Sequence, residues 1–147
     1  MTTIAVKDGI VASDSRLTQG DVVLDDQYDK RRECNGVQFF IAGNVTDDEQ
    51  VISCYFEGED VIEDVEGTPA AEFIIADGLD VYYGGIEVHG FWKMKIRTGT
   101  PYAIGSGASY ALGAMDAGAT AKEAVKIASR DVYTGGIIRT HKLKGKK

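Results

Sequence analysis

Residues 1–16 read MTTIAVKDGIVASDSR, and this opening stretch decides the fold predicted for the chain. Two β-rich segments, residues 2–6 and residues 10–13, flank Asp8-Gly9, a dipeptide typical of a two-residue hairpin turn. The pattern therefore predicts that the chain begins as a β-hairpin, with Asp14 directly after the second strand.

The second residue is a threonine, and it gains unusual chemistry if Met1 is removed. Thr2 would then carry a free α-amino group beside its own hydroxyl, so one residue would supply both a nucleophile and a general base. A model α-amino group titrates near ~7.7–8.0, so a useful fraction is already a base at neutral pH. A small residue after the initiator methionine is also commonplace, so the rest of the chain has to support this hypothesis.

The composition predicts one water-soluble domain over residues 1–147. The chain is 44% hydrophobic and 27% charged, which is typical of a globular protein and excludes a disordered one. No apolar run approaches the ~20 residues of a membrane helix, and no secretory signal opens the chain, so we expect a cytoplasmic protein without a membrane partner.

Charge argues against a nucleic-acid surface, because the net charge of -7 contrasts with the basic patch that such a surface needs. The one basic cluster lies at the C-terminus and predicts a solvated, mobile tail over residues 142–147, with Lys142, Lys144, Lys146 and Lys147.

The cysteines and histidines are too scattered for a zinc site. Cys34 falls in a predicted strand and Cys54 on an apolar helix face, so we expect buried free thiols. Neither His89 nor His141 has an obvious nucleophile to serve, and both are interpreted as structural. We expect neither a metal nor an organic cofactor.

A second hairpin is predicted around Asn35-Gly36, the strongest two-residue turn signal in the sequence, with strands at residues 30–34 and 37–42. The second of these strands is almost wholly apolar, as expected of an interior strand covered on both faces. A polar connection through Gln19-Gly20-Asp21 is expected between the first and second hairpins.

A helix is predicted over residues 46–56, where Thr46 and Glu49 form a capping box. The acidic residues 57–66 are expected to form a solvated loop with at most a helical stub. A third hairpin follows at residues 71–76 and 79–83, and further strands are expected around Trp92 and Ile96, bracketed by glycine pairs and turns that include Gly84-Gly85 and Thr98-Gly99.

After a short strand at residues 102–104, the spacing of apolar residues changes from that of strands to that of helices. A helix is expected to run through Met115 and stop near Gly118, and a second to start at the Thr120–Glu123 capping box and include Val132 on its apolar face. A last strand is expected at residues 137–141. This order predicts an α+β fold in which antiparallel sheets are sandwiched by helix layers.

Five segments, in this order, resemble the proteasome β-type subunit family, which includes the HslV peptidase. They are the Thr2 hairpin with Asp14-Ser15-Arg16, then Lys30, Gly43, the Gly-Ser-Gly segment Gly105-Ser106-Gly107, and the segment from Asp131 to Thr134-Gly135-Gly136. The resemblance implies an N-terminal nucleophile hydrolase fold, a four-layer α-β-β-α sandwich, and assembly into a homo-oligomeric ring.

The resemblance also implies a role for each matched residue. Thr2 would be the nucleophile and, through its amine, the general base; Asp14 and Lys30 would be the buried charged pair beside it. The Gly43 N–H would supply the oxyanion hole. Ser106, Asp131 and Thr134 would orient the α-amino group and a water molecule.

The pattern of elements departs from the family in one place. Members typically carry two long helices after Gly43, whereas only the helix over residues 46–56 is predicted here, so one helix layer should be reduced. The substrate pocket is expected to draw on residues 18–20 and 44–47. Only Met1 precedes Thr2 in this sequence, so an aminopeptidase would have to expose it.

Three functions follow from these residues as hypotheses. The first is a threonine-type endopeptidase acting on unfolded polypeptides or peptides inside a ring, which by analogy would need a ring-shaped ATP-dependent unfoldase for folded substrates. The second is an amidase of the same type acting on a small amide, and the third is a catalytically silent structural subunit. Taken singly, each charged residue has an ordinary alternative: Asp14 as a turn carboxylate paired with Arg16, Lys30 as an exposed strand lysine, Asp131 as a helix-end carboxylate.

Overall fold

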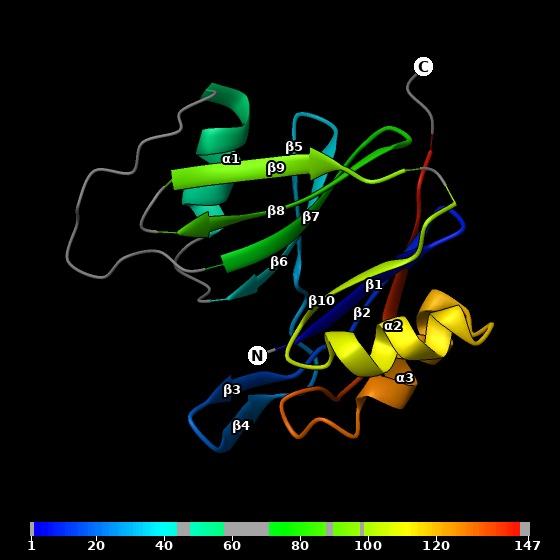
Figure 1. Ribbon diagram of the computed structural model, residues 1–147. Helices are drawn as coiled ribbons and strands as arrows, with labels where there is room; N and C mark the ends of the chain where they lie inside the picture. Colours follow the sequence, from blue (N-terminus) through cyan, green and yellow to red (C-terminus); the bar gives the residue numbers. More distant parts are fainter. Residues whose placement is uncertain (1, 44–47, 58–70, 88–89, 98, 145–147) are drawn as a thin grey trace.

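Two antiparallel β-sheets face each other in the computed structural model, and helices cover their outer faces (Figure 1). The structure describes residues 2–43, 48–57, 71–87, 90–97 and 99–144. Helix α1 (Asp48–Glu57) packs on one sheet, and helices α2 (Ala108–Asp116) and α3 (Ala121–Ala128) pack on the other.

The first sheet has four strands and contains the predicted opening hairpin. Its order is β10-β1-β2-β11, with β10 at Tyr102–Gly105, β1 at Thr3–Lys7, β2 at Ile10–Ser13 and β11 at Arg139–Lys142. Asp8 and Gly9 both have positive φ, 51° and 74°, as a type I′ turn requires. The prediction of a hairpin here is confirmed, and it leaves Asp14 at the end of β2.

The second sheet has five strands in sequential order. They are β5 (Arg31–Cys34), β6 (Val37–Gly43), β7 (Ala71–Asp77), β8 (Asp80–Glu87) and β9 (Gly90–Lys95). The hairpins β5–β6 and β7–β8 are confirmed, and β6 is an interior strand as predicted. Gly84 and Gly85 were expected to end a strand but lie inside β8, where a Cβ at Gly84 would collide with the Trp92 carbonyl and the ring of Phe73.

A two-stranded hairpin was missed by the sequence analysis. Strands β3 (Leu17–Gln19) and β4 (Val22–Asp25) pair outside both main sheets, and the expected polar connection through Gln19-Gly20-Asp21 is the turn between them. All four residues of β4 are exposed, so the strand lacks the alternation of apolar and polar residues that marks a half-buried strand.

The helices follow the sequence with one difference. The capping box of Thr120 and Glu123 is present at the start of α3, as predicted. That helix ends at Ala128, however, and Val132 is 70% exposed in the turns that follow instead of lying on the helix face. The Thr46–Glu49 capping box and residues 58–66 of the acidic segment lie outside the described residues; Glu57 closes α1.

Three apolar cores separate four layers. Ile4, Phe40 and Ile74 lie in the core between the two sheets; Ala5, Val125 and their neighbours fill the space between the first sheet and α2 with α3. The third core packs the second sheet against α1, with the side chains of Phe39, Phe73, Ile75, Val51 and Cys54. The α+β fold with an α-β-β-α layer order is therefore confirmed, and α1 is the only described helix on its face.

The termini of the described chain are held by the first sheet. Lys142 belongs to β11, and Leu143 is buried and donates its N–H to the carbonyl of Gly9 over 2.8 Å. The expected mobile tail therefore does not begin at Lys142; residues 145–147 lie outside the described residues.

Within the part of the chain that the structure describes, no helix is long and apolar enough to cross a membrane.

The capping box at α3 gives a stability prediction. The Thr120 hydroxyl accepts the N–H of Glu123 over 3.1 Å, so Thr120→Ala should lower the free energy of unfolding by about 1 kcal/mol. Urea denaturation followed by circular dichroism measures the change. Thr100→Ala, at an exposed position outside any helix, is the matched control and should change stability by less than ~0.5 kcal/mol. Equal losses in the two variants would contradict the capping role.

Candidate active site

The opening strand places Thr2 beside the turn that precedes α2. Thr3 pairs with Gly105 in the β1–β10 ladder, and the carbonyl of Thr2 accepts hydrogen bonds from the Gly107 N–H and the Ser106 hydroxyl, both at 3.5 Å. Gly105 has a φ of 96°, and a Cβ there would collide with the Thr2 carbonyl. A glycine at this position therefore allows the close approach that fixes Thr2.

The Thr2 side chain meets a lysine and an aspartate. Lys30 Nζ donates to Thr2 Oγ1, and Thr2 Oγ1 donates to Asp14 Oδ1. Lys30 Nζ also lies 2.7 Å from Asp14 Oδ1, which closes a triangle of three side chains from three segments of the chain. All three residues are buried, with at most 6% of their surface exposed.

The Asp14 carboxylate accepts hydrogen bonds from three backbone N–H groups. Its Oδ1 accepts the Thr3 N–H at 3.0 Å, and its Oδ2 accepts the N–H groups of Gly135 at 3.0 Å and Arg16 at 3.3 Å. A buried carboxylate needs both a cation and hydrogen bonds, and this one has both. The ordinary alternative, a turn carboxylate paired with the Arg16 side chain, is wrong, because that guanidinium binds Asp26 instead.

Burial changes the proton affinity of Lys30. The pKa of Lys30 is lowered from 10.5, chiefly by loss of hydration on burial; the Asp14 carboxylate opposes this change and the nearby charge of Arg16 adds to it. Lys30 is thus not the exposed strand lysine of the ordinary alternative. A lysine with a lowered pKa exchanges protons with a neighbouring hydroxyl more readily than a solvated one.

This shift predicts how stability depends on pH. Because the folded-state pKa of Lys30 lies below 10.5, the unfolded chain binds this proton more tightly than the folded chain does. Below the folded-state pKa Lys30 is charged in both states, so the full cost of burying the charge lowers the stability there. The free energy of unfolding should therefore increase as the pH rises from the folded-state pKa to 10.5. Lys30→Met should lack this gain in urea titrations at several pH values. Parallel pH curves for the two proteins would contradict the assignment.

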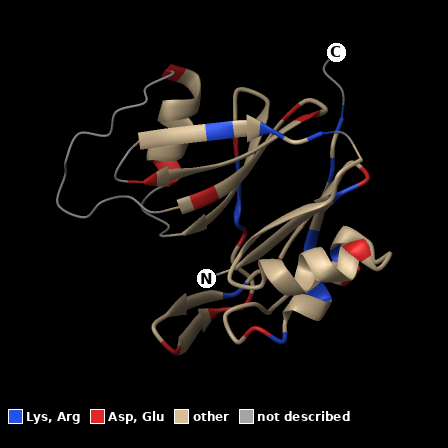
Figure 2. Ribbon diagram, viewed as in Figure 1, with Lys and Arg blue, Asp and Glu red and all other residues tan. Residues whose placement is uncertain are grey.

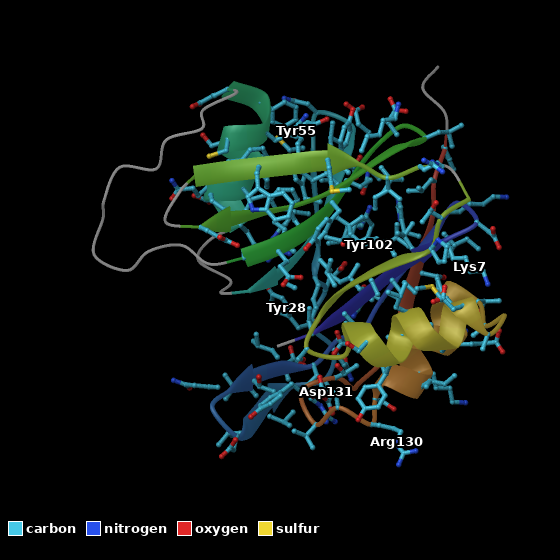
Figure 3. All side chains as sticks on the ribbon, in the orientation of Figure 1. Lys7, Tyr28, Tyr55, Tyr102, Arg130 and Asp131 are labelled. Atoms are coloured by element: carbon cyan, nitrogen blue, oxygen red, sulfur yellow. The ribbon has the colours of Figure 1, made fainter. Side chains whose placement is uncertain are left out.

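Ser106, Asp131 and Thr134 form a second cluster next to the first. Asp131 Oδ2 accepts the Ser106 hydroxyl at 2.5 Å and the Thr134 hydroxyl at 2.9 Å. Burial alone would raise the pKa of Asp131, but these hydrogen bonds outweigh it, so its pKa is lowered. Asp131 lies below α2 in the view of Figure 3. Because Ser106 also bonds the Thr2 carbonyl, the two clusters are continuous.

Gly43 is the one candidate residue that stands apart from these contacts. It is the exposed last residue of β6, paired with Ala71 of β7. Its link to the cluster is indirect: the Ile41 N–H, two residues earlier, donates to the Lys30 carbonyl over 3.4 Å. Residues 44–47, expected to shape the substrate pocket, lie outside the described residues.

Two contributors were missed by the sequence analysis. Thr3 is fully buried, and its hydroxyl shares a 2.7 Å hydrogen bond with Thr134, which ties β1 to the second cluster. Gly135 was noted only as part of a motif, yet its N–H binds Asp14. Neither contact had a signal in the sequence beyond the motif itself, because both join residues more than 100 positions apart.

A cavity lies beside the cluster and reaches two of its residues. Among the described residues, no group of three or more His, Cys, Asp and Glu is placed to hold a metal ion. A cavity of about 620 Å³ between α3 and residues 134–138 reaches Asp14 and Thr134, and Lys122 and Lys126 lie on its wall. Along the described part of the chain, acidic and basic residues are interspersed in the view of Figure 2.

Comparison with known proteins identifies the fold. No protein-family model and no curated protein sequence matches the chain. Solved structures do: HslV from Trypanosoma brucei superposes with a TM-score of 0.73 at 19% identity, covering 97% of this chain and 98% of that one. BPH from Thiobacillus denitrificans, in complex with epoxomicin, gives a TM-score of 0.66 at 19% identity, covering 99% of both chains. The chain has the HslV-like fold of proteasome β-type subunits.

Proposed function

We propose that this chain is a threonine-type endopeptidase whose nucleophile is Thr2, exposed by removal of Met1. The observation that carries the proposal is the buried triangle in which the Thr2 hydroxyl lies between Lys30 Nζ and Asp14 Oδ1. A surface threonine has no need of a buried ion pair, and burying one is costly unless geometry and hydrogen bonds compensate. The fold shared with HslV supports the same activity.

The first step would be attack of the Thr2 oxygen on the carbonyl carbon of a peptide bond. The hydroxyl proton would pass to the free α-amine, while the ammonium of Lys30 stabilises negative charge developing on the oxygen. Asp14 would keep the lysine oriented, because its carboxylate is fixed by three backbone N–H groups. The C–N bond would then break, the departing amine would take the proton from the α-amine, and an ester to Thr2 would remain.

The second step would be hydrolysis of that ester by water. The α-amine would again accept a proton, and the Thr2 oxygen would regain one as it leaves. In this proposal Ser106, Asp131 and Thr134 position the amine and the water molecule. The Gly43 N–H would donate to the oxyanion in both steps, where a preorganised donor is worth roughly 10²–10³ in rate.

The proposed substrates are unfolded polypeptides and peptides, and the proposed assembly is a homo-oligomeric ring. Both follow from the likeness in fold to HslV and from the resemblance of the five sequence segments. A ring-shaped ATP-dependent unfoldase is proposed as the partner that would deliver folded substrates. The reaction itself needs neither metal nor organic cofactor in this scheme, since the amine, hydroxyl and lysine supply the proton transfers.

The proposal is tested with protein that truly begins at Thr2, made by removing an N-terminal fusion and checked by intact mass. It should hydrolyse an unfolded polypeptide and fluorogenic peptides, and it should sediment as a closed oligomer. The same protein with Met1 retained is the matched control and should be inactive, because its amine is locked in a peptide bond.

Each alternative predicts a different outcome. Cleavage of small amides by a monomer, with no action on polypeptides, would favour the amidase and contradict the endopeptidase. A closed oligomer that starts at Thr2 and cleaves nothing would favour the silent structural subunit.

A further inference from the structure

Arg16 is clamped next to the candidate site without touching Thr2. Its Nε and one terminal nitrogen bind the two oxygens of Asp26 at 2.8 and 3.1 Å, a bidentate pair, and the other terminal nitrogen donates to the Val132 carbonyl at 3.1 Å. Hydrogen bonding to Asp26 raises the pKa of Arg16, so the guanidinium stays charged at every working pH.

The guanidinium packs directly on the backbone of Gly135. A Cβ at Gly135 would lie 2.5–2.8 Å from three atoms of the Arg16 guanidinium, so any larger residue there would have to displace the arginine. Asp26 also contacts this segment, because its carbonyl accepts the Ile137 N–H at 3.2 Å. Arg16 and Asp26 together therefore fix residues 132–137 from one side.

The fixed segment carries groups that set the geometry of the site. Gly135 donates its N–H to Asp14 Oδ2, and Thr134 donates its hydroxyl to Asp131. The backbone N–H of Arg16 donates a further hydrogen bond to Asp14 Oδ2. One side chain thus braces both clusters through a loop distant in sequence.

Arg16 also acts by charge. Two charged groups act on Lys30: the Asp14 carboxylate favours the ammonium, and the Arg16 guanidinium disfavours it. The Thr2 hydroxyl, which accepts a hydrogen bond from Lys30 Nζ, is uncharged. Removal of the Arg16 charge should therefore raise the pKa of Lys30.

We infer that Arg16, backed by Asp26, is a positioning residue for the proposed reaction: it locks residues 132–137 onto Asp14 and tunes the charge felt by Lys30. This inference rests on the proposed function. It adds a role for a residue that makes no contact with the nucleophile, and it separates that role into a geometric part and an electrostatic part.

The test compares three variants of the Met1-free protein in a pH series of peptide hydrolysis. Arg16→Met removes both parts and should lower kcat about 10–100-fold with a smaller change in KM, as expected for misplaced catalytic groups. Its basic limb should move to higher pH, because the Lys30 ammonium that the reaction uses then holds its proton more tightly. Arg16→Lys keeps the charge but not the planar clamp, so kcat should fall while the limb stays in place. Arg97→Met, an exposed arginine replaced in the same way, is the control and should match the wild type.

The outcomes separate this inference from the proposed function. An Arg16→Met protein with wild-type kcat and an unmoved limb would overturn the inference while the wild type still works. A loss of kcat that merely tracks a loss of folded protein by circular dichroism, with no movement of the limb, would also overturn it. A wild type that hydrolyses nothing would instead contradict the proposed function.

Discussion

Thr2→Val should abolish peptide hydrolysis by the Met1-free protein, with kcat/KM lowered roughly 10⁴-fold or more, as expected when the nucleophile of a covalent mechanism is removed. Valine keeps the shape of the side chain and loses only the hydroxyl that lies between Lys30 and Asp14. The free α-amine remains, so this variant separates the nucleophile from the base. Steady-state kinetics on a fluorogenic peptide measure the loss.

Thr2→Ser is the matched control for this variant. Serine retains both the hydroxyl and the amine, and hydrolysis should remain measurable, within roughly 10²-fold of the wild type. Both substitutions should keep the fold, because the buried side chains of β1, Thr3–Val6, are unchanged. Comparable activity in Thr2→Val and Thr2→Ser would show that the Thr2 hydroxyl is not the nucleophile.

Lys30→Met should lower both activity and stability. The cation that faces the Thr2 oxygen is lost, so kcat/KM should fall about 10²–10³-fold, the range typical when a preorganised group that stabilises developing charge is removed. Asp14 would stay buried with three N–H donors but no cation, and losing one partner of a buried pair costs about 3–5 kcal/mol. Peptide hydrolysis and urea denaturation measure the two effects on the same preparation.

The double variant Asp14→Asn with Lys30→Met separates the two effects. Removing both charges leaves no unpaired buried ion, so most of the lost stability should return. Activity should stay at the level of Lys30→Met, because no cation faces Thr2. Recovery of activity along with stability would mean that Lys30 serves only to hold the fold.

The elements that the sequence predicted well are those whose signal lies within a few neighbouring residues. The hairpins at Asp8-Gly9 and Asn35-Gly36 and the capping box at Thr120 each combine a turn or cap residue with the right spacing inside a short window. The hairpin β3–β4 lacked such a signal, because its strands are short and β4 is exposed on both faces. Val132 fitted the helical period of α3, but the helix ended earlier than that period suggested.

The candidate site also has a part that the sequence could predict and a part that it could not. The motifs indicated which residues to inspect, and the structure brings six of the seven, all except Gly43, into continuous hydrogen-bonded contact. The brace formed by Arg16 on Gly135 could not be predicted, since it joins segments more than 100 positions apart and depends on the space left by a missing side chain. Sequence patterns specify residue types, whereas such contacts depend on how the layers pack.

One measurement tests the central claim most directly: peptide mapping by mass spectrometry after treatment with a peptide epoxyketone. Such a compound offers one electrophilic carbon to a hydroxyl and a second to an amine, so it reports on both groups of Thr2. We predict a single adduct on the N-terminal peptide of the Met1-free protein and none on the protein that retains Met1. An unmodified N-terminal peptide that begins at Thr2 would contradict the account.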